Sequence, residues 1–223
     1  MNGLEILPLN QEQLVIKNDI LVCLNIFVIL QVVIISFGEM VKLPLNKGYL
    51  TAKTDKASDE QYTPAYAVKP LLKYLDMYCN KSNYIIWCPF DTEDSEYVKI
   101  FRAEGYNVIA THIDTGQNFF TYEPEEHYDF IISNPPFSIK DDILRRLYEL
   151  NKPYAILLPI PTLQGQTRFP YMKDCQALIF DKRINFYKDA TKTQMQKGAS
   201  FASFYLCKDF LPRDLIFEEL EVE

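Results

Sequence analysis

The tetrapeptide Asn134-Pro135-Pro136-Phe137 contains the groups needed to present an aromatic amine as a nucleophile. The lone pair of such an amine is delocalised into its ring, and two hydrogen-bond acceptors aimed at its two hydrogens would make it more available. The side-chain oxygen of Asn134 and the carbonyl of Pro135 can be these acceptors. Consecutive prolines fix φ and keep the preceding residue extended, so the direction of the carbonyl is set in advance. Phe137 adds a flat apolar face on which a planar base can stack.

The same four residues have a purely structural interpretation. An Asn-Pro turn can close a buried strand, and Phe137 can then simply pack in the core. A predicted strand at 130–133 leads directly into the motif, which is compatible with both interpretations.

From Lys53 onward the chain alternates predicted strands and helices, the pattern of a doubly wound α/β domain. We predict strands at 84–88, 106–111, 130–133, 154–158, 177–180 and 201–206, and helices at 65–78, 95–104 and 139–150. Candidate chemical motifs follow Cys88, Thr111 and Ser133, each at the carboxyl end of a predicted strand. Ligands of such sheets bind at these ends, so the agreement favours an enzyme.

With a strand entering Asn134-Pro135-Pro136-Phe137, the chain resembles the S-adenosylmethionine-dependent methyltransferases that modify the N6 amine of adenine. The resemblance covers about residues 53–210. It implies an α/β fold, a single Rossmann-like methyltransferase domain with a mostly parallel sheet, and S-adenosylmethionine as cofactor. It also implies that Asn134, Pro135, Pro136 and Phe137 are the catalytic residues. A sulfonium methyl donor is already activated, so alignment does most of the work and no general base is strictly required.

The segment Gln61-Tyr62-Thr63-Pro64 resembles the family's short motif upstream of the first strand, which closes over the methionine end of the cofactor. The resemblance implies that Tyr62, Thr63 and Pro64 bind the cofactor. From the residues alone, the segment is a helix start, with Thr63 as N-cap and Pro64 as the first helical residue. The two interpretations are compatible.

Cys88-Pro89-Phe90-Asp91 occupies the place of the family's first cofactor loop. The resemblance implies contacts from Pro89, Phe90 and Asp91, with Asp91 facing the cofactor's ammonium. The sequence departs from the family pattern because Thr92-Glu93-Asp94 follows, where glycines are usual. A loop without glycine cannot approach a ligand as closely.

Two further segments resemble cofactor-binding parts of the family. His112 stands where an acidic residue usually accepts from the ribose, and Asp114 lies two residues on, so either can take that role. Asn118 replaces the carboxylate of a Gly-x-Asp-Phe segment, and its oxygen can accept from the cofactor's adenine amine. Phe119 would form the apolar wall of that site. The alternatives are that His112 is a surface loop residue and that Phe119 belongs to the core.

Length and composition set the outer limits. The 223 residues suffice for one well-buried α/β domain, and the net charge of −7 argues against indiscriminate coating of nucleic acid. The five cysteines have no paired spacing and there are only two histidines, so we predict no metal site, free thiols and a reducing, cytoplasmic location.

Positive charge is concentrated in residues 164–200, which carry seven Lys or Arg against three Asp. Such a stripe can follow a phosphate backbone, although solvated surfaces look the same. Together with the resemblance it predicts a nucleic-acid partner, with DNA favoured over RNA.

Residues 1–39 differ from the rest. The eighteen residues 20–37 carry no charge, a length at the threshold for a membrane-spanning helix. We predict a boundary between an N-terminal extension at 1–39 and a methyltransferase domain at 40–223. The extension is a non-functional upstream segment, a membrane anchor or an extra packed element, and the sequence leaves these open.

The sequence therefore predicts an adenine-N6-specific DNA methyltransferase. Two alternatives remain. One is an enzyme that methylates a glutamine amide in a protein, which uses the same acceptor logic. The other is a methyltransferase-fold binding module without catalysis, which the glycine-free loop after Asp91 would suit.

Overall fold

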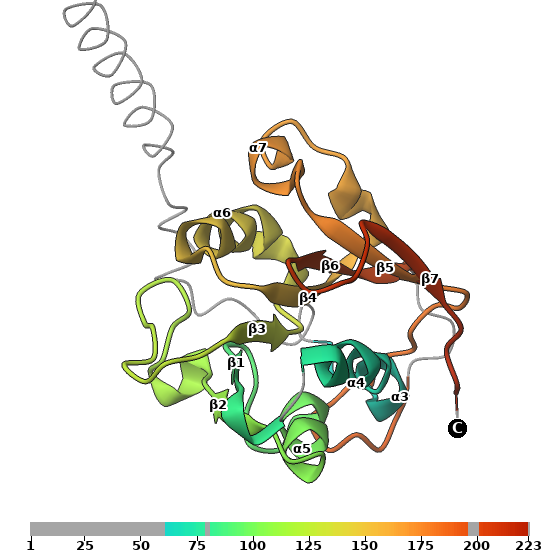
Figure 1. Cartoon of the computed structure of the whole chain (residues 1–223). Helices are drawn as coiled ribbons and strands as arrows, with labels where there is room; N and C mark the ends of the chain where they lie inside the picture. The colour runs from blue at the N-terminus through green and yellow to red at the C-terminus, as the bar shows by residue number, and fades with distance from the viewer. Residues whose placement is uncertain (1–60, 79–80, 196–200, 223) are drawn as a thin grey trace, which may run out of the picture. The chain divides into compact units, whose positions relative to one another are not determined.

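The computed structural model describes residues 61–78, 81–195 and 201–222. In these ranges the chain forms a seven-stranded sheet in the order β2-β1-β3-β4-β6-β5-β7 (Figure 1). The strands are β1 (Ile85–Cys88), β2 (Asn107–Ala110), β3 (Phe130–Ser133), β4 (Tyr154–Pro159), β5 (Gln176–Phe180), β6 (Ser203–Lys208) and β7 (Leu215–Glu218). The α-helices are α3 (Ala65–Val68), α4 (Pro70–Leu75), α5 (Glu96–Ala103), α6 (Lys140–Leu150) and α7 (Phe169–Met172).

The sheet is mostly parallel, which confirms the predicted fold class. β1 pairs in parallel with both β2 and β3, and β3 pairs in parallel with β4. β6 runs antiparallel to both of its neighbours. The chain runs outward from β1 to β2, then returns to β3 and continues to β4 in the other direction. The order therefore reverses between β1 and β3, and the carboxyl ends of these two strands flank the crevice where doubly wound sheets bind ligands.

Helices cover both faces of the sheet, with α6 on one side and α3, α4 and α5 on the other (Figure 1). Ile86 and Cys88 of β1 belong to the same buried cluster as Leu71 of α4 and Phe101 of α5. Strand periodicity turns the intervening Trp87 to the opposite face. β3 is buried along its whole length, as expected for a central strand covered on both faces.

The helix predicted at 65–78 is divided into three elements: α3, α4 and the 3-10 helix η2 (Asp76–Tyr78). Pro70 has no backbone N–H to continue the α3 ladder, and α4 begins at this proline instead. The prediction of Thr63 as N-cap was wrong by one residue. Pro64 is the N-cap of α3, and the N-terminus of this helix has no capping hydrogen bond from a side chain. The helix predicted from Ser95 is α5, and the Ser95 hydroxyl accepts from Val98 N at 3.2 Å.

Among the α-helices and strands of the described residues, two were not predicted. α7 is a single turn, and β7 is an edge strand whose Leu215 and Phe217 are 48% and 68% exposed. α7 has only four residues, and in β7 the buried Ile216 lies between the exposed but apolar Leu215 and Phe217, so neither segment shows a clear apolar/polar period in the sequence.

The predicted boundary at residue 39 and the uncharged segment 20–37 lie outside the described residues. Within the described ranges, no helix has the length and apolar character needed to cross a membrane.

Gly105 ends α5 with φ of +91°, in the left-handed region, and no atom lies within 4 Å of the position that a Cβ would take. We expect Gly105→Ala to lower the free energy of unfolding by about 1–2 kcal/mol through backbone strain alone. Gly105→Asn should lose less, because Asn tolerates this region better. Denaturant titration of the three proteins measures both changes, and equal stability of all three would contradict the argument.

Candidate active site at the carboxyl edge of the sheet

Asn134 follows the last residue of β3, and a hydrogen bond fixes its side chain. Asn134 Nδ2 donates to the backbone carbonyl of Gln61 at 2.6 Å. Only the amide nitrogen can donate to a carbonyl, so this bond determines which end of the carboxamide is oxygen. Asn134 Oδ1 is buried and has no hydrogen-bond partner among the described residues.

A buried oxygen without a partner is uncommon in a folded protein and costs on the order of 1–3 kcal/mol. Within one carboxamide, Nδ2 of Asn134 is hydrogen-bonded, whereas Oδ1 is buried without a partner among the described residues. Such an oxygen is available to accept a hydrogen from a bound ligand.

Phe137 lies in an aromatic cluster built from three separate segments. Its ring centroid is 5.3 Å from Phe201 and 6.2 Å from Phe186, with interplanar angles of 88° and 73°. Phe186 is fully buried, whereas Phe137 is partly buried and packs against the core. The predicted core contact of Phe137 is therefore present, and its partial exposure also leaves ring surface for a ligand.

The segment that contains Tyr62 is held from the far end of the chain. Tyr187 N donates to Tyr62 O at 2.9 Å, and Asn185 N donates to Tyr66 Oη at 2.8 Å. These bonds hold the Gln61-Tyr62-Thr63-Pro64 segment against residues 185–187, and the bond from Asn134 Nδ2 to Gln61 O places it beside Asn134. Two motifs that are more than seventy residues apart in the sequence are thus brought together.

Asp91, in the loop after β1, turns its side chain into the protein. Its carboxylate is 6% exposed and accepts a hydrogen bond from the hydroxyl of Ser133. Burial raises the pKa of Asp91 to about 6, against the opposing effects of hydrogen bonds from Ser133 and Ser95 and of the charge on Lys192. Contact between Asp91 and a cofactor's ammonium stays a prediction, and in this structure the carboxylate faces β3.

The loops after β1 and β2 are tied to each other by backbone bonds. Asp91 N donates to Thr111 O at 3.1 Å, and Thr111 N donates to Cys88 O at 3.0 Å. Trp87 Nε1 donates to Thr111 Oγ1 at 2.8 Å. Pro89 and Phe90 are thereby held in a fixed turn, and the Asp91 amide is already used within the protein.

His112 and Asp114 interact with each other at the end of β2. Asp114 N donates to His112 Nδ1 at 3.2 Å, which caps the short 3-10 helix η4 (Ile113–Thr115). A bond from the His112 ring to a ribose would therefore use Nε2. The Asp114 side chain is 55% exposed.

Asn118 and Phe119 have structural roles in the protein. Asn118 Oδ1 accepts from Phe120 N at 3.0 Å and so closes a local turn. Phe119 is 2% exposed, with its ring centroid 5.5 Å from Trp87 and 4.9 Å from Phe90. The core interpretation of Phe119 is present in the structure, whereas binding of the cofactor's adenine by Asn118 stays a prediction.

Five neighbours of the site were not predicted as such: Ser133, Ser95, Phe186, Phe201 and Lys192. Ser95 contacts Asp91 within one loop, whereas the contacts of the other four join segments that are distant in the sequence. Of these residues, Ser133 could have been predicted from the sequence, because it directly precedes Asn134 at the end of a buried strand.

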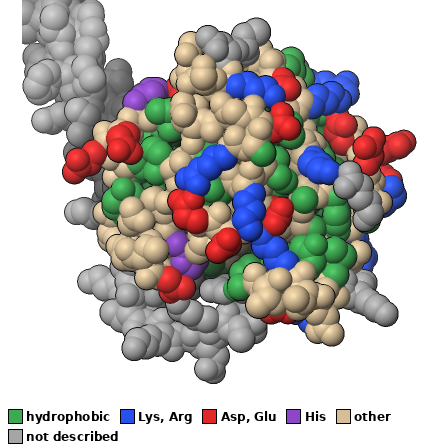
Figure 2. Space-filling view, turned by 90° about the horizontal axis from the view of Figure 1, so that it is seen from below, with side chains coloured by type: hydrophobic (Ala, Val, Ile, Leu, Met, Phe, Trp, Pro, Cys, Tyr) green, Lys and Arg blue, Asp and Glu red, His purple; other side chains and the backbone are tan. Residues whose placement is uncertain are grey.

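The basic stripe predicted at 164–200 is partly neutralised. Three of its cationic side chains form ion pairs with carboxylates: Arg168 with Asp141, Lys182 with Asp181 and Lys192 with Glu96. Lys197 lies outside the described residues. On the face seen in Figure 2, acidic and basic side chains are also interleaved and form no region of one sign.

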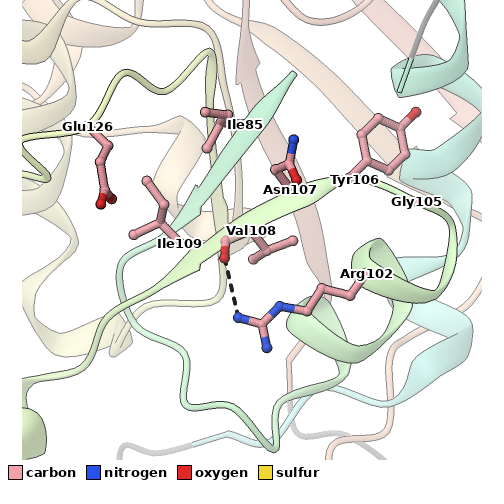
Figure 3. Close-up of a pocket in the computed structure, with 8 residues that line it drawn as sticks. All are labelled: Ile85, Arg102, Gly105, Tyr106, Asn107, Val108, Ile109 and Glu126. Atoms are coloured by element: carbon pink, nitrogen blue, oxygen red, sulfur yellow. Dashed lines mark hydrogen bonds between the residues drawn. The ribbon is translucent and has the colours of Figure 1, made fainter. Parts of the chain in front are cut away.

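A cavity of about 540 Å³ lies beside β2, away from the candidate site (Figure 3). It is lined by Ile85, Arg102, Gly105, Tyr106, Asn107, Val108, Ile109 and Glu126. Ile85 and Asn107 are the first residues of β1 and β2, so the cavity includes the amino-terminal ends of these two strands, whereas the predicted site residues follow the carboxyl ends. None of the predicted site residues lines it. Across the described ranges, no group of three or more His, Cys, Asp or Glu side chains is arranged to hold a metal ion.

No family model matches the sequence, and no curated protein matches it. Solved structures with a similar arrangement include the methyltransferase subunit of a type I restriction-modification system from Streptococcus thermophilus (13% identity, TM-score 0.41), which covers 74% of this chain and 48% of its own. A Listeria monocytogenes protein assigned as a class I S-adenosylmethionine-dependent methyltransferase has 12% identity and TM-score 0.42, over 78% of this chain and 69% of its own. A Thermoplasma acidophilum protein assigned as a methyltransferase has 11% identity and TM-score 0.34, over 67% and 66%.

The chain thus spans about half the length of the Streptococcus subunit and about two thirds of the other two. All three TM-scores are below 0.5, so the Rossmann-like assignment rests on the strand order and strand directions of this chain itself.

The raised pKa of Asp91 predicts a pH dependence of stability. Because its folded-state pKa of about 6 exceeds the unfolded value of 3.8, the folded protein binds more protons between these values. Stability should therefore fall as the pH rises from about 4 to 6, by at most about 3 kcal/mol, and this contribution should be constant above that window. Asp91→Asn should lack it. Urea titrations from pH 4.5 to 7.5 measure the free energy of unfolding of both proteins. If it changes with pH in the same way in both, Asp91 does not have a raised pKa.

Proposed function

We propose that this protein transfers a methyl group from S-adenosylmethionine to the N6 amine of adenine in a nucleic acid, with DNA favoured over RNA. The observation that carries the proposal is the Asn134 carboxamide, whose nitrogen is held by Gln61 O while its oxygen is buried and unpartnered. A side chain fixed in this way is ready to accept a hydrogen from an amine that enters the site.

Asn134 Oδ1 would accept one hydrogen of the N6 amine, and the carbonyl of Pro135 would accept the other. Both acceptors are positioned before the substrate arrives, because Gln61 holds the side chain and the prolines restrict the backbone. The bond from the methyl carbon to N6 would form as its bond to the sulfonium sulfur breaks, S-adenosylhomocysteine would leave, and the methylated amine would release one proton to water. Neither acceptor then needs to change its protonation state. Phe137, supported edge-on by Phe201 and Phe186, would stack against the base.

The methyl donor would lie at the carboxyl ends of β1 and β3, where the strand order reverses. When bound, S-adenosylmethionine supplies a methyl group activated by its sulfonium. The unpartnered Asn134 oxygen beside this crevice fits an acceptor amine placed next to that methyl group. The residues that would surround the donor are Tyr62, Thr63, Pro64, Pro89, Phe90, His112, Asp114, Asn118 and Phe119.

If the substrate is a duplex, the target adenine has to leave the base stack to reach Asn134. The loops around residues 164–168 and 183–197, of which 196 and 197 lie outside the described residues, would then contact the flanking nucleotides. Phe169 and Leu163 are 66% and 47% exposed, so they offer apolar surface to unstacked bases.

The test uses the full chain with methyl-labelled S-adenosylmethionine and, separately, duplex DNA, single-stranded DNA, tRNA and a mixture of proteins. Label recovered as N6-methyladenine is the expected result, and the preferred polymer names the substrate class. Cofactor binding with label only in protein amide would replace the proposal by the glutamine-methylating alternative. Absence of cofactor binding by calorimetry would leave the non-catalytic module.

We expect Asn134→Ala to lower kcat by about a hundredfold or more, because one of the two fixed acceptors is lost at the reacting amine. The Kd for S-adenosylmethionine should change by less than about threefold, since Asn134 is assigned to the acceptor side. Single-turnover methylation and calorimetry measure the two quantities. Asn107→Ala is the control for general damage, because Asn107 Nδ2 also donates to a backbone carbonyl (Ser82 O, 2.8 Å) but lies at the first residue of β2, away from the site. Full activity of Asn134→Ala would exclude the proposed role.

Phe137→Ala should raise the Kd for an adenine-containing oligonucleotide, because base stacking on an aromatic ring contributes about 1–3 kcal/mol. Phe137→Tyr keeps the ring and should bind like the wild type. Fluorescence anisotropy with an oligonucleotide that keeps the target adenine and carries a dye at one end measures binding. A loss of thermal stability in Phe137→Ala at unchanged Kd would instead assign Phe137 to core packing alone.

A further inference from the structure

A side-chain hydrogen bond joins the loop after β1 to the residue that precedes Asn134. The hydroxyl of Ser133, the last residue of β3, donates to the carboxylate of Asp91. Ser133 is 0% exposed and Asp91 is 6% exposed. The bond therefore links, inside the protein, the two strands that flank the reversal in strand order.

The position of this bond matters because the β1–β3 ladder stops short of it. The pairing of these strands includes Ile86 with Phe130 and Trp87 with Ile131, and ends there. On its other side, Ser133 pairs with Ile156 of β4. Between the end of the ladder and Asn134, the bond from Ser133 to Asp91 therefore connects β3 to the loop that follows β1.

The surroundings of Asp91 favour a fixed carboxylate. Burial of a carboxylate is unfavourable unless it is hydrogen-bonded, and both Ser133 and Ser95 interact with this one. The positive charge of Lys192 attracts it, and Lys192 is itself held by Glu96 and the Asp94 carbonyl. The other titratable groups nearby are the buried hydroxyls of Tyr97 and Tyr205 and the buried Cys88 thiol, and burial raises the pKa of all three.

We propose that Asp91 is a positioning residue for the acceptor motif: through Ser133 it fixes the end of β3, and thereby the direction in which Asn134 Oδ1 points. This role replaces the contact between Asp91 and a cofactor's ammonium that the sequence predicted. The inference rests on the proposed function for its consequence in catalysis. The geometric coupling of Asp91 and Ser133 to Asn134 can be measured without it.

The experiment compares the full-length wild type with Ser133→Ala, Asp91→Asn and Ser203→Ala. Ser203 is the matched control, because it is also a buried serine at the end of a central strand, but its hydroxyl has no partner among the described residues. Asp91→Asn keeps an acceptor for Ser133 and removes the charge. Thermal unfolding of all four proteins shows whether each variant is folded.

The first readout needs neither cofactor nor substrate. In protein labelled with ¹⁵N-asparagine, the Asn134 side-chain amide is assigned by its absence from Asn134→Asp, and its exchange with water is measured. We expect exchange about tenfold faster in Ser133→Ala, an intermediate change in Asp91→Asn and no change in Ser203→Ala. An unchanged Asn134 signal in Ser133→Ala and Asp91→Asn would overturn the proposal, whether or not the protein methylates anything. If Ser133→Ala does not fold, Asp91→Asn decides.

The second readout separates positioning from cofactor binding. For a positioning residue, Ser133→Ala and Asp91→Asn both lower kcat by about tenfold or more, while the Kd for S-adenosylmethionine stays within about threefold of wild type. For a cofactor ligand, Asp91→Asn raises that Kd and Ser133→Ala changes neither quantity, which would overturn the proposal. A wild type that transfers no methyl group would count against the proposed function alone, since the Asn134 exchange measurement would still decide the coupling.

Discussion

The candidate site depends on the hydrogen bond from Asn134 Nδ2 to the Gln61 carbonyl. This bond satisfies one end of a carboxamide and leaves the other end, Oδ1, buried without a partner. It also connects the segment before the first strand to the end of β3. A free asparagine side chain would rotate among several orientations, and a ligand would have to restrict it to one of them on binding. Holding it in advance removes that entropic cost from the binding step.

Asn134 lies at the end of β3, next to the point where the strand order reverses between β1 and β3. Parallel strands end at the same edge, so the loops after β1, β2 and β3 meet there. β3 is central and fully buried, which gives its last residues a rigid base. The β1–β3 ladder ends at Trp87 and Ile131, and the Asp91–Ser133 bond lies beyond its end. The acceptor motif is thus held by a side-chain bond where the backbone pairing of these two strands has stopped.

The glycine-free loop after β1 has a coherent explanation in this arrangement. Its Asp91 amide bonds to Thr111 and its Asp91 carboxylate bonds to Ser133, so the loop is held by the protein itself. Ser95 both caps α5 and contributes to the environment of Asp91. Glycines in such a loop permit close approach of the backbone to a ligand. Here Thr92, Glu93 and Asp94 stand in place of glycine, and the side chains of Glu93 and Asp94 form ion pairs with Arg102 and Lys99 of α5.

The sequence by itself determined the order of the main strands and helices, because buried strands and amphipathic helices have distinct periodicities. It also determined that a buried strand leads into the motif Asn134 to Phe137, because the strand and the motif are each recognised from residues that are adjacent in the sequence. Tertiary structure decided what each side chain contacts. Asp91 faces Ser133, Asn118 closes a local turn, Phe119 packs on Trp87, and Lys192 pairs with Glu96. These contacts join residues far apart in the sequence or compete with local alternatives, and no local pattern specifies which partner a buried polar group will find. The edge strand β7 was missed because Leu215, Ile216 and Phe217 are all apolar, so the sequence does not alternate, although Ile216 is buried between two exposed residues.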